Sequence, residues 1–173
     1  QETPRGKEII LSRADPVFVE KLFAREVPEI SSGSVIVKGI AREAGTGTKI
    51  TVASGQSGVD PVGSCVGQKG VRVQAVTNEL GGERVDIVPW SENLEELIIA
   101  ALSPAENLTV TLNEKEKVAK VKAPEDQLSL VIGKDGQNVR LAAKLTGWRI
   151  EAEENSIEKT EEKKEKEESK PKK

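Results

Sequence analysis

A tetrapeptide of the form Gly-x-x-Gly occurs twice in the same context, and this repeat most constrains how the chain can fold. The first copy is Gly67-Gln68-Lys69-Gly70 and the second is Gly133-Lys134-Asp135-Gly136. In each copy a short apolar segment precedes the glycines, an amphipathic helical pattern follows them, and a strand pattern comes after a glycine near the helix end. The repeat predicts two small domains of the same architecture.

The helix–GxxG–helix–strand unit resembles the KH fold, whose loop clamps a short run of single-stranded nucleic acid. Each copy is preceded by a further helix and two strands, which is the order of the type II arrangement of that fold. We therefore predict an α+β fold with two tandem type II KH domains. Each domain should hold a three-stranded mixed sheet with helices packed on one face.

In the first unit, local signals set the element boundaries. Asp15-Pro16 predicts a helix start with an aspartate N-cap and a proline at the first helical position, and Pro28 should stop that helix. Two strands are expected at 35–40 and 49–53. A second cap-plus-proline pair, Asp60-Pro61, opens the helix before the first loop. The last strand is expected at 84–88.

The second unit repeats this order. Ser91 is a candidate N-cap for a helix whose apolar residues at 94, 97, 98 and 101 share one face. Strands are expected at 108–112 and 118–121, and Pro124 should open the helix before the second loop. A final strand is expected at 148–151.

These patterns divide the chain into four parts. We expect a remnant of an upstream domain or a linker at 1–14, the first KH domain at 15–90, the second at 91–153, and a disordered tail rich in Glu and Lys at 154–173. The strand-like run at 8–12 belongs to the first part. Because Ser91 follows Trp90 with almost no linker, the two domains should pack rigidly against each other. The absence of methionine suggests a fragment or a processed form.

The charge and the aromatic content limit the ways in which the chain could bind nucleic acid. There are 26 basic and 29 acidic residues, so the net charge of −3 is unlike that of a domain that binds nucleic acid by bulk charge. Two Trp and two Phe are too few for the stacking platforms of RRM or OB-type domains. Binding would have to depend on local geometry and a few placed cations.

Several function classes are disfavoured. The chain has no His, the commonest general base, and no P-loop or dinucleotide fingerprint. Its single cysteine, Cys65, excludes an internal disulfide and a zinc set, and should be a small core residue. No apolar run approaches the roughly 20 residues that a membrane span needs. We expect a cytoplasmic monomer that is not an enzyme, uses no cofactor or metal, and does not enter a membrane.

The chemistry of each loop suits a phosphate backbone. Glycine tolerates positive φ and has no Cβ, so a sugar-phosphate chain can approach closely, and the following helix presents free N–H groups to an anion. The first loop offers Gln68 and Lys69, with Arg72 one turn further on. The second offers Lys134, whose charge Asp135 cancels. We expect the first loop to hold phosphate more strongly.

Beyond the repeat, the amino-acid sequence resembles that of the family of the bacterial transcription elongation, termination and antitermination factor NusA. The most specific segment is Gly136-Gln137-Asn138-Val139-Arg140-Leu141-Ala142-Ala143-Lys144-Leu145-Thr146-Gly147-Trp148. Further matching segments lie at 10–13, 21–23, 26–30, 59–63, 73–76, 78–80, 101–105 and 126–130. Together they span most of residues 9–150.

This resemblance implies two KH domains that form one surface for nascent single-stranded RNA during transcription. Carried over by position, the RNA-facing residues of the first unit are Gly63, Ser64, Val66, Gly67, Gln68, Lys69, Gly70 and Arg72, with Asp86, Ile87 and Val88 on the strand. Those of the second are Ile132, Gly133, Lys134, Asp135, Gly136, Gln137, Asn138 and Arg140, with Arg149, Ile150 and Glu151. The resemblance further implies that residues 1–14 are the remnant of an upstream OB-type barrel or a linker. RNA polymerase would be bound through family domains that this sequence does not contain.

Two other functions stay open on the sequence alone. A ribosome-associated KH protein or ribosome assembly factor would share the motif, although such chains are usually much more basic. A structural spacer whose GxxG loops bind nothing is the other alternative, because a single GxxG also serves as a turn between helices.

Overall fold

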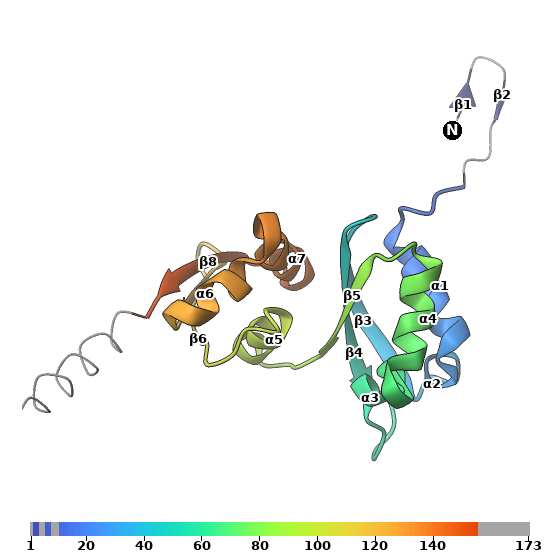
Figure 1. The fold of residues 1–173 in the computed structure, drawn as a ribbon, viewed down its shortest axis with the longest axis horizontal. Coiled ribbons are helices and arrows are strands. Elements are labelled where there is room, and N and C mark those ends of the chain that lie inside the picture. Colours follow the sequence, from blue (N-terminus) through green and yellow to red (C-terminus); the bar gives the residue numbers. More distant parts are fainter. Residues whose placement is uncertain (1, 4–5, 8–10, 156–173) are drawn as a thin grey trace, which may run out of the picture. The chain divides into compact units, whose positions relative to one another are not determined.

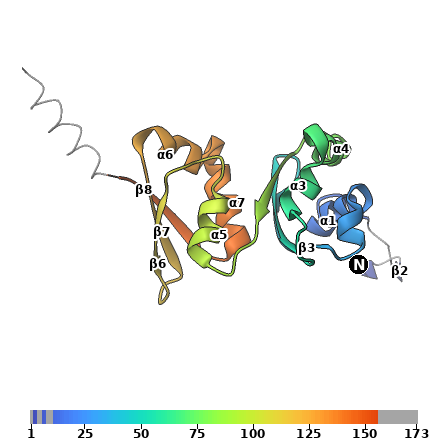
Figure 2. The same cartoon turned by 90° about the horizontal axis from the view of Figure 1, so that it is seen from below.

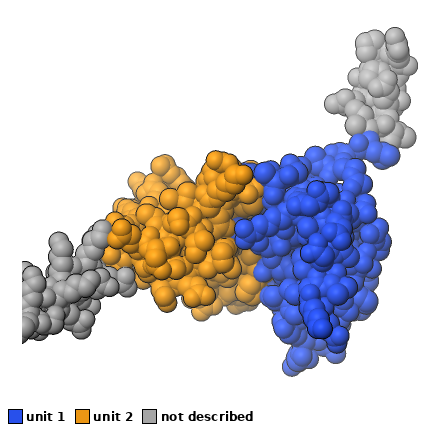
Figure 3. Space-filling model, viewed as in Figure 1, with its two compact units in different colours: residues 1–87 blue, residues 88–173 orange. Residues whose placement is uncertain are grey.

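The computed structural model describes residues 2–3, 6–7 and 11–155, and the chain divides into two compact units. The first unit comprises residues 1–87 and the second residues 88–173 (Figure 3). Each unit carries one GxxG motif and one three-stranded sheet.

The first unit follows the expected order of elements, with one short helix and one pair of two-residue strands added (Figure 1). Its elements are β1 (Glu2–Thr3), β2 (Gly6–Lys7), α1 (Pro16–Glu26), α2 (Pro28–Ser31), β3 (Val35–Glu43), β4 (Gly47–Ser54), α3 (Pro61–Val66), the 3₁₀ turn η1 (Gln68–Gly70), α4 (Val71–Glu79) and β5 (Arg84–Pro89). Of the strand-like run predicted at 8–12, residues 8–10 lie outside the described residues, and Leu11 and Ser12 are not in a strand. The β1–β2 pair was not predicted.

Both cap-plus-proline predictions for this unit are confirmed. The Asp15 side chain accepts a hydrogen bond from the Val17 amide at 2.9 Å and begins α1. The Asp60 side chain accepts from the Val62 amide at 3.1 Å and begins α3. The helix α1 ends before Pro28, as expected, and Pro28 also occupies the first position of α2. That position tolerates proline because its N–H would have no helical partner.

The core of the first unit lies between its sheet and its helices. β3 and β4 are antiparallel and β4 lies between β3 and β5. The predicted face of α1, formed by Val19, Leu22 and Phe23, is buried, as is Cys65 on α3. Burial raises the pKa of the Cys65 thiol to about 11, so the side chain is a neutral core group.

The second unit repeats this architecture with α5 (Leu94–Ala101), β6 (Thr109–Asn113), β7 (Val118–Ala123), α6 (Glu125–Ile132), η2 (Lys134–Gly136), α7 (Gln137–Thr146) and β8 (Arg149–Glu154). β7 pairs antiparallel with β6 and parallel with β8, so the sheet is mixed. In Figure 2, α5 and α7 lie on one side of this sheet. The α+β fold with two type II KH units, each with a three-stranded mixed sheet, is confirmed. β8 continues to Glu154, and residues 156–173 of the predicted tail lie outside the described residues.

One predicted cap was wrong. Asn93, and not Ser91, is the N-cap of α5, and its side chain accepts from the amide of Glu95 at 2.9 Å. Ser91 instead accepts from the Asn93 amide at 3.0 Å and donates to Glu96 at 2.7 Å. Both residue types suit a helix start, so the sequence alone did not distinguish two positions that are two residues apart.

A buried carboxylate, that of Glu83, is hydrogen-bonded to β3, to β4 and to the turn between them. Glu83 is 2% exposed and accepts two hydrogen bonds of 2.9 Å from the Arg42 guanidinium, one of 2.5 Å from the Thr48 hydroxyl and one of 2.8 Å from the Gly45 amide. Arg42 also donates to two main-chain carbonyls that precede α1. Burial raises the pKa of Glu83, but these hydrogen bonds outweigh it and hold the pKa below its ordinary value of 4.5.

Replacing Glu83 by Gln should lower the free energy of unfolding by about 3 kcal/mol at pH 7, because Arg42 keeps a buried charge without its partner. The folded pKa of Glu83 lies below the unfolded one, so its contribution is complete above about pH 4.5 and is lost as the pH falls through the folded value. The difference between the wild type and Glu83→Gln in urea denaturation should therefore be constant from neutral pH down to about pH 5 and shrink below it.

The control is Glu79→Gln, which removes an exposed pair with Arg13 at 3.5 Å and should cost less than about 1 kcal/mol. A loss for Glu83→Gln no larger than that of the control would contradict the assignment.

Candidate nucleic-acid interface

The two GxxG loops have the same backbone conformation. The first glycines, Gly67 and Gly133, have φ/ψ of 74°/172° and 73°/176°. The third residues, Lys69 and Asp135, have φ of 53° and 52°, and each final glycine is left-handed and begins the next helix. The chain reverses direction in the same way in both units, so the repeated sequence motif adopts one backbone conformation in both places.

The first glycine of each loop cannot be replaced without strain. Its φ/ψ lies in a region that only glycine occupies readily. A Cβ on Gly67 would lie 2.8 Å from Cγ of Arg72, and a Cβ on Gly133 would lie 2.7 Å from Cβ of Asn138. Arg72 and Asn138 occupy the same position in the two units, five residues after that glycine. Because glycine has no side chain, Arg72 and Asn138 can occupy the space that a Cβ on the glycine would need.

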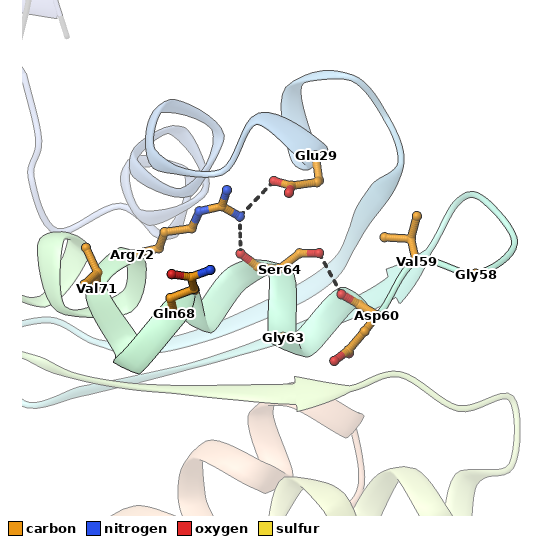
Figure 4. A pocket seen from close by; sticks show the side chains of 10 residues that line it. Glu29, Gly58, Val59, Asp60, Gly63, Ser64, Gln68, Val71 and Arg72 are labelled. Carbon is orange, nitrogen blue, oxygen red and sulfur yellow. Dashed lines mark hydrogen bonds and ion pairs between the residues drawn. The ribbon is translucent and has the colours of Figure 1, made fainter.

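In the first unit, Arg72 braces the reversal. One nitrogen of its guanidinium, Nη1, donates to the Ser64 carbonyl oxygen on α3 at 2.7 Å and to the Glu29 carboxylate on α2 at 2.9 Å (Figure 4). A hydrogen bond from its own main-chain amide and the Arg72 guanidinium hold the pKa of Glu29 below its ordinary value. The sequence placed Arg72 among the cations for phosphate, but the structure ties this guanidinium to α2 and α3.

In the second unit, Asn138 makes the corresponding brace. Its amide nitrogen donates to the Leu130 carbonyl oxygen on α6 and to the Leu102 carbonyl oxygen at the end of α5, both at 2.9 Å. Leu130 and Ser64 each lie three residues before the first glycine of their loop. A neutral amide therefore holds the second loop where a cation holds the first.

The two middle residues of each loop project into solvent. Gln68, Lys69, Lys134 and Asp135 are all exposed. Within residues 11–155, the side chains of Gln68, Lys69 and Lys134 have no hydrogen-bond or ion-pair partner. Arg140 donates to the main-chain carbonyl of Asp135 and so folds back onto the second loop. The first loop carries one uncompensated cation, and the second carries a lysine next to a carboxylate.

The strand residues assigned to the interface are largely engaged within the protein. Asp86 pairs with Arg84 and with the buried Lys49, both at 2.9 Å, and Arg149 pairs with Glu151 at 3.1 Å. Ile87 and Ile150 pack against the cores of their units, and Val88 is 1% exposed. The side chain of Val88 is therefore not accessible to a ligand.

The remaining predicted positions lie on the helices that flank the loops. Val66 and Gln137 are half-buried, and Gln137 has a buried amide nitrogen with no hydrogen-bond partner among the described residues. Ile132 and Leu130 are each 41% exposed, so the second unit presents aliphatic surface before its loop.

A cleft of about 700 Å³ lies beside the first loop (Figure 4). The predicted residues Gly63, Ser64, Gly67, Gln68 and Arg72 line it, together with Glu29, Gly58, Val59, Asp60 and Val71, which the sequence did not assign to the site. Asp60 was recognised only as a helix cap, and Glu29 comes from a short helix that was not predicted. Neither carries a local signal of a binding role.

The comparisons with known proteins agree with this geometry. Residues 13–90 match the NusA-like first KH domain, and residues 94–160 match the NusA-like second KH domain. The chain belongs to the NusA family. Within the described residues no helix is long and apolar enough to cross a bilayer, and no group of three or more His, Cys, Asp or Glu could hold a metal ion.

Two relatives show how much of a NusA protein the chain spans. The transcription termination/antitermination protein NusA of Bacillus subtilis is 54% identical over 151 residues, which is 87% of this chain and 41% of that protein. The NusA protein of Thermus thermophilus is 49% identical over 156 residues, which is 90% of this chain and 40% of the relative. The chain thus spans about two fifths of these relatives.

A solved structure shares the fold at lower identity. The crystal structure of APE1850 superposes with a TM-score of 0.51 at 23% identity and covers 76% of this chain and 96% of its own. This similarity supports the fold alone.

Changing Gly133 to Ala should lower the free energy of unfolding by about 3 kcal/mol, because strain in the glycine-only region adds to the clash with Asn138. Gly147→Ala, at the other end of α7, is the matched control. Gly147 also has positive φ, at 72°, but no atom lies within 4 Å of a Cβ added there, so about 1 kcal/mol is expected. Equal losses in urea denaturation would show that the close approach of Asn138 contributes nothing.

Proposed function

We propose that this chain binds single-stranded RNA through its two GxxG loops and is the RNA-binding part of a transcription termination and antitermination factor. The observation that carries the proposal is the repeated loop geometry, in which two glycines leave the main chain bare beside a helix N-terminus. The names of the relatives support the transcriptional role.

The geometry suits an extended backbone better than a duplex. Each loop is short, and its two middle side chains point outward, so a strand can lie against the glycines. Of the two loops, the first has the uncompensated cation Lys69, and it should contribute more of the electrostatic affinity. The two loops on one chain would engage one RNA at a high effective concentration, which raises the apparent affinity.

Contact with RNA polymerase belongs to the same proposal at the level of the longer protein. The relatives are more than twice as long as the matched region, so other domains of such a protein would make that contact. The chain is proposed to act in the cytoplasm as a monomer, without catalysis.

Replacing Gln68 and Lys69 together by Asp should weaken binding of a short single-stranded RNA by at least about tenfold, because two carboxylates then face the phosphates. Both side chains are exposed, so the thermal unfolding midpoint should not fall. The matched control is Lys21→Asp, an exposed lysine on α1 outside both loops. Unchanged affinity for the loop variant in a fluorescence-polarisation titration would refute the role of the first loop.

Salt dependence distinguishes the two loops. Lys69→Ala should flatten the slope of log K against log salt by about 0.7, the value for one phosphate contact on a single strand. Lys134→Ala should change the slope less, because Asp135 already offsets the charge of that lysine. A larger change for Lys134→Ala would reverse the proposed ranking.

A further inference from the structure

One peptide bond of the second loop joins a chemically reactive pair of residues. Asp135 is followed by Gly136, and nowhere else in the sequence does an Asp or Asn precede a Gly. In such a pair the glycine nitrogen can attack the carboxyl carbon of the aspartate side chain, because glycine has no Cβ to shield its nitrogen. Asp135 is exposed, so water also reaches this group. The equivalent position of the first loop holds Lys69, which has no carboxyl group.

The reaction of this pair needs no reagent other than water. A bond forms between the Gly136 nitrogen and Cγ of Asp135, a C–O bond of the neutral carboxyl group breaks, and the hydroxyl leaves as water with the amide proton. Water then adds to the main-chain carbonyl carbon of the cyclic imide, and the bond from that carbon to the nitrogen breaks. The main chain now runs through Cγ and is longer by one carbon, and the former main-chain carbonyl carbon becomes a free carboxylate. The product is an isoaspartate.

The backbone conformation of the closed loop opposes the first step. The ring closes only when Cβ of Asp135 and the Gly136 nitrogen lie on the same side of the bond between Cα and the carbonyl carbon of Asp135. Because the peptide group is planar, ψ of Asp135 alone sets this relation. The observed ψ is 26°, which places the two atoms on nearly opposite sides of that bond. The carboxyl carbon therefore cannot reach the nitrogen while the loop keeps this conformation.

Hydrogen bonds hold both ends of this peptide group. The Gly136 amide donates to the Gly133 carbonyl oxygen at 3.2 Å. The Asp135 carbonyl oxygen accepts a hydrogen bond from Nη1 of Arg140, which lies on the first turn of α7. Rotation of the peptide group to the reactive ψ has to break both hydrogen bonds and to disturb the left-handed Gly136 that caps α7. The reaction therefore requires the loop to open.

We propose that Asp135–Gly136 is a site of isoaspartate formation that the closed second loop restrains, and that Arg140 is the residue that holds its peptide group in the unreactive conformation. The added carbon lengthens the main chain between Gly133 and Gly136, so the modified chain no longer has the spacing of the GxxG turn. Because Lys69 takes the place of Asp135 in the first loop, the first GxxG turn is not subject to this change. The inference stands independently of RNA binding.

The first test compares the complete chain in its folded state and unfolded in guanidinium chloride, at the same neutral pH and temperature. Isoaspartate at position 135 is followed over weeks by mass spectrometry of the peptide that contains it, with electron-transfer fragmentation. We expect isoaspartate to form in the unfolded chain and at least about thirtyfold more slowly in the folded one, because only the opened fraction of the loop reacts. Equal rates would overturn the restraint, and no isoaspartate in the unfolded chain would overturn the site.

The variant Arg140→Ala tests the role of the arginine, and Lys144→Ala, at an exposed residue one turn further along α7, is the matched control. Arg140→Ala should speed isoaspartate formation in the folded protein about fivefold, which corresponds to the loss of one hydrogen bond. Lys144→Ala should leave the rate unchanged. Arg140 is exposed, so the thermal unfolding midpoint should change little. The same rate in both variants would show that Arg140 does not restrain the reaction.

Asp135→Asn provides a second measurement, which decides the question even if Arg140→Ala unfolds. Asparagine tolerates the left-handed conformation of this position, and its side chain closes the same ring with ammonia as the leaving group. The loss of ammonia and the addition of water change the mass of the peptide, so the reaction is easily followed. Deamidation should again be at least about thirtyfold slower in the folded chain than in the unfolded one. Equal deamidation rates in the two states would overturn the proposal.

Discussion

The reversal of the chain at the first glycine of each GxxG motif is the constraint on which both units depend. At Gly67 and Gly133 the backbone takes a conformation that only glycine adopts readily, and the residue five positions later fills the space that a Cβ would need. Arg72 or Asn138 then fastens the following helix to the preceding one. The reversal leaves the two middle side chains in solvent and bares the main chain before α4 and α7.

The two units use one backbone with different chemistry. The brace of the first unit is a guanidinium held by a carboxylate, and that of the second is a neutral amide held by two carbonyl oxygens. The first unit has the half-buried Ser64 and Val66 before its loop and an uncompensated Lys69 in it, while the second has exposed Leu130 and Ile132 at the corresponding positions. Identical loop geometry therefore does not imply equal contributions to binding. Charge and apolar surface are distributed unequally between two sites that the fold makes alike.

In the first unit, the loop and the cleft beside it differ in charge. The loop carries the exposed Lys69, and the cleft is lined by Glu29, Asp60 and Arg72. Arg72 and Glu29 form an ion pair at 2.9 Å, so neither brings an uncompensated charge into the cleft. The proposed binding of a polyanion by this near-neutral chain therefore depends on bare main chain and on placed cations such as Lys69, and not on a basic surface.

The sequence by itself determined the repeat, the order of helices and strands, and the caps at Asp15 and Asp60, because these follow from glycine conformation, hydrophobic period and hydrogen bonds to neighbouring residues. It failed where neighbours far along the chain decide. The engagement of Arg72 with Glu29, the burial of Val88, and the position of Asp60 beside the cleft all depend on tertiary structure. The choice of Asn93 over Ser91 is a local one between two suitable caps. Local rules specify which groups are present, but only packing decides which of them are already paired and which remain available to a ligand.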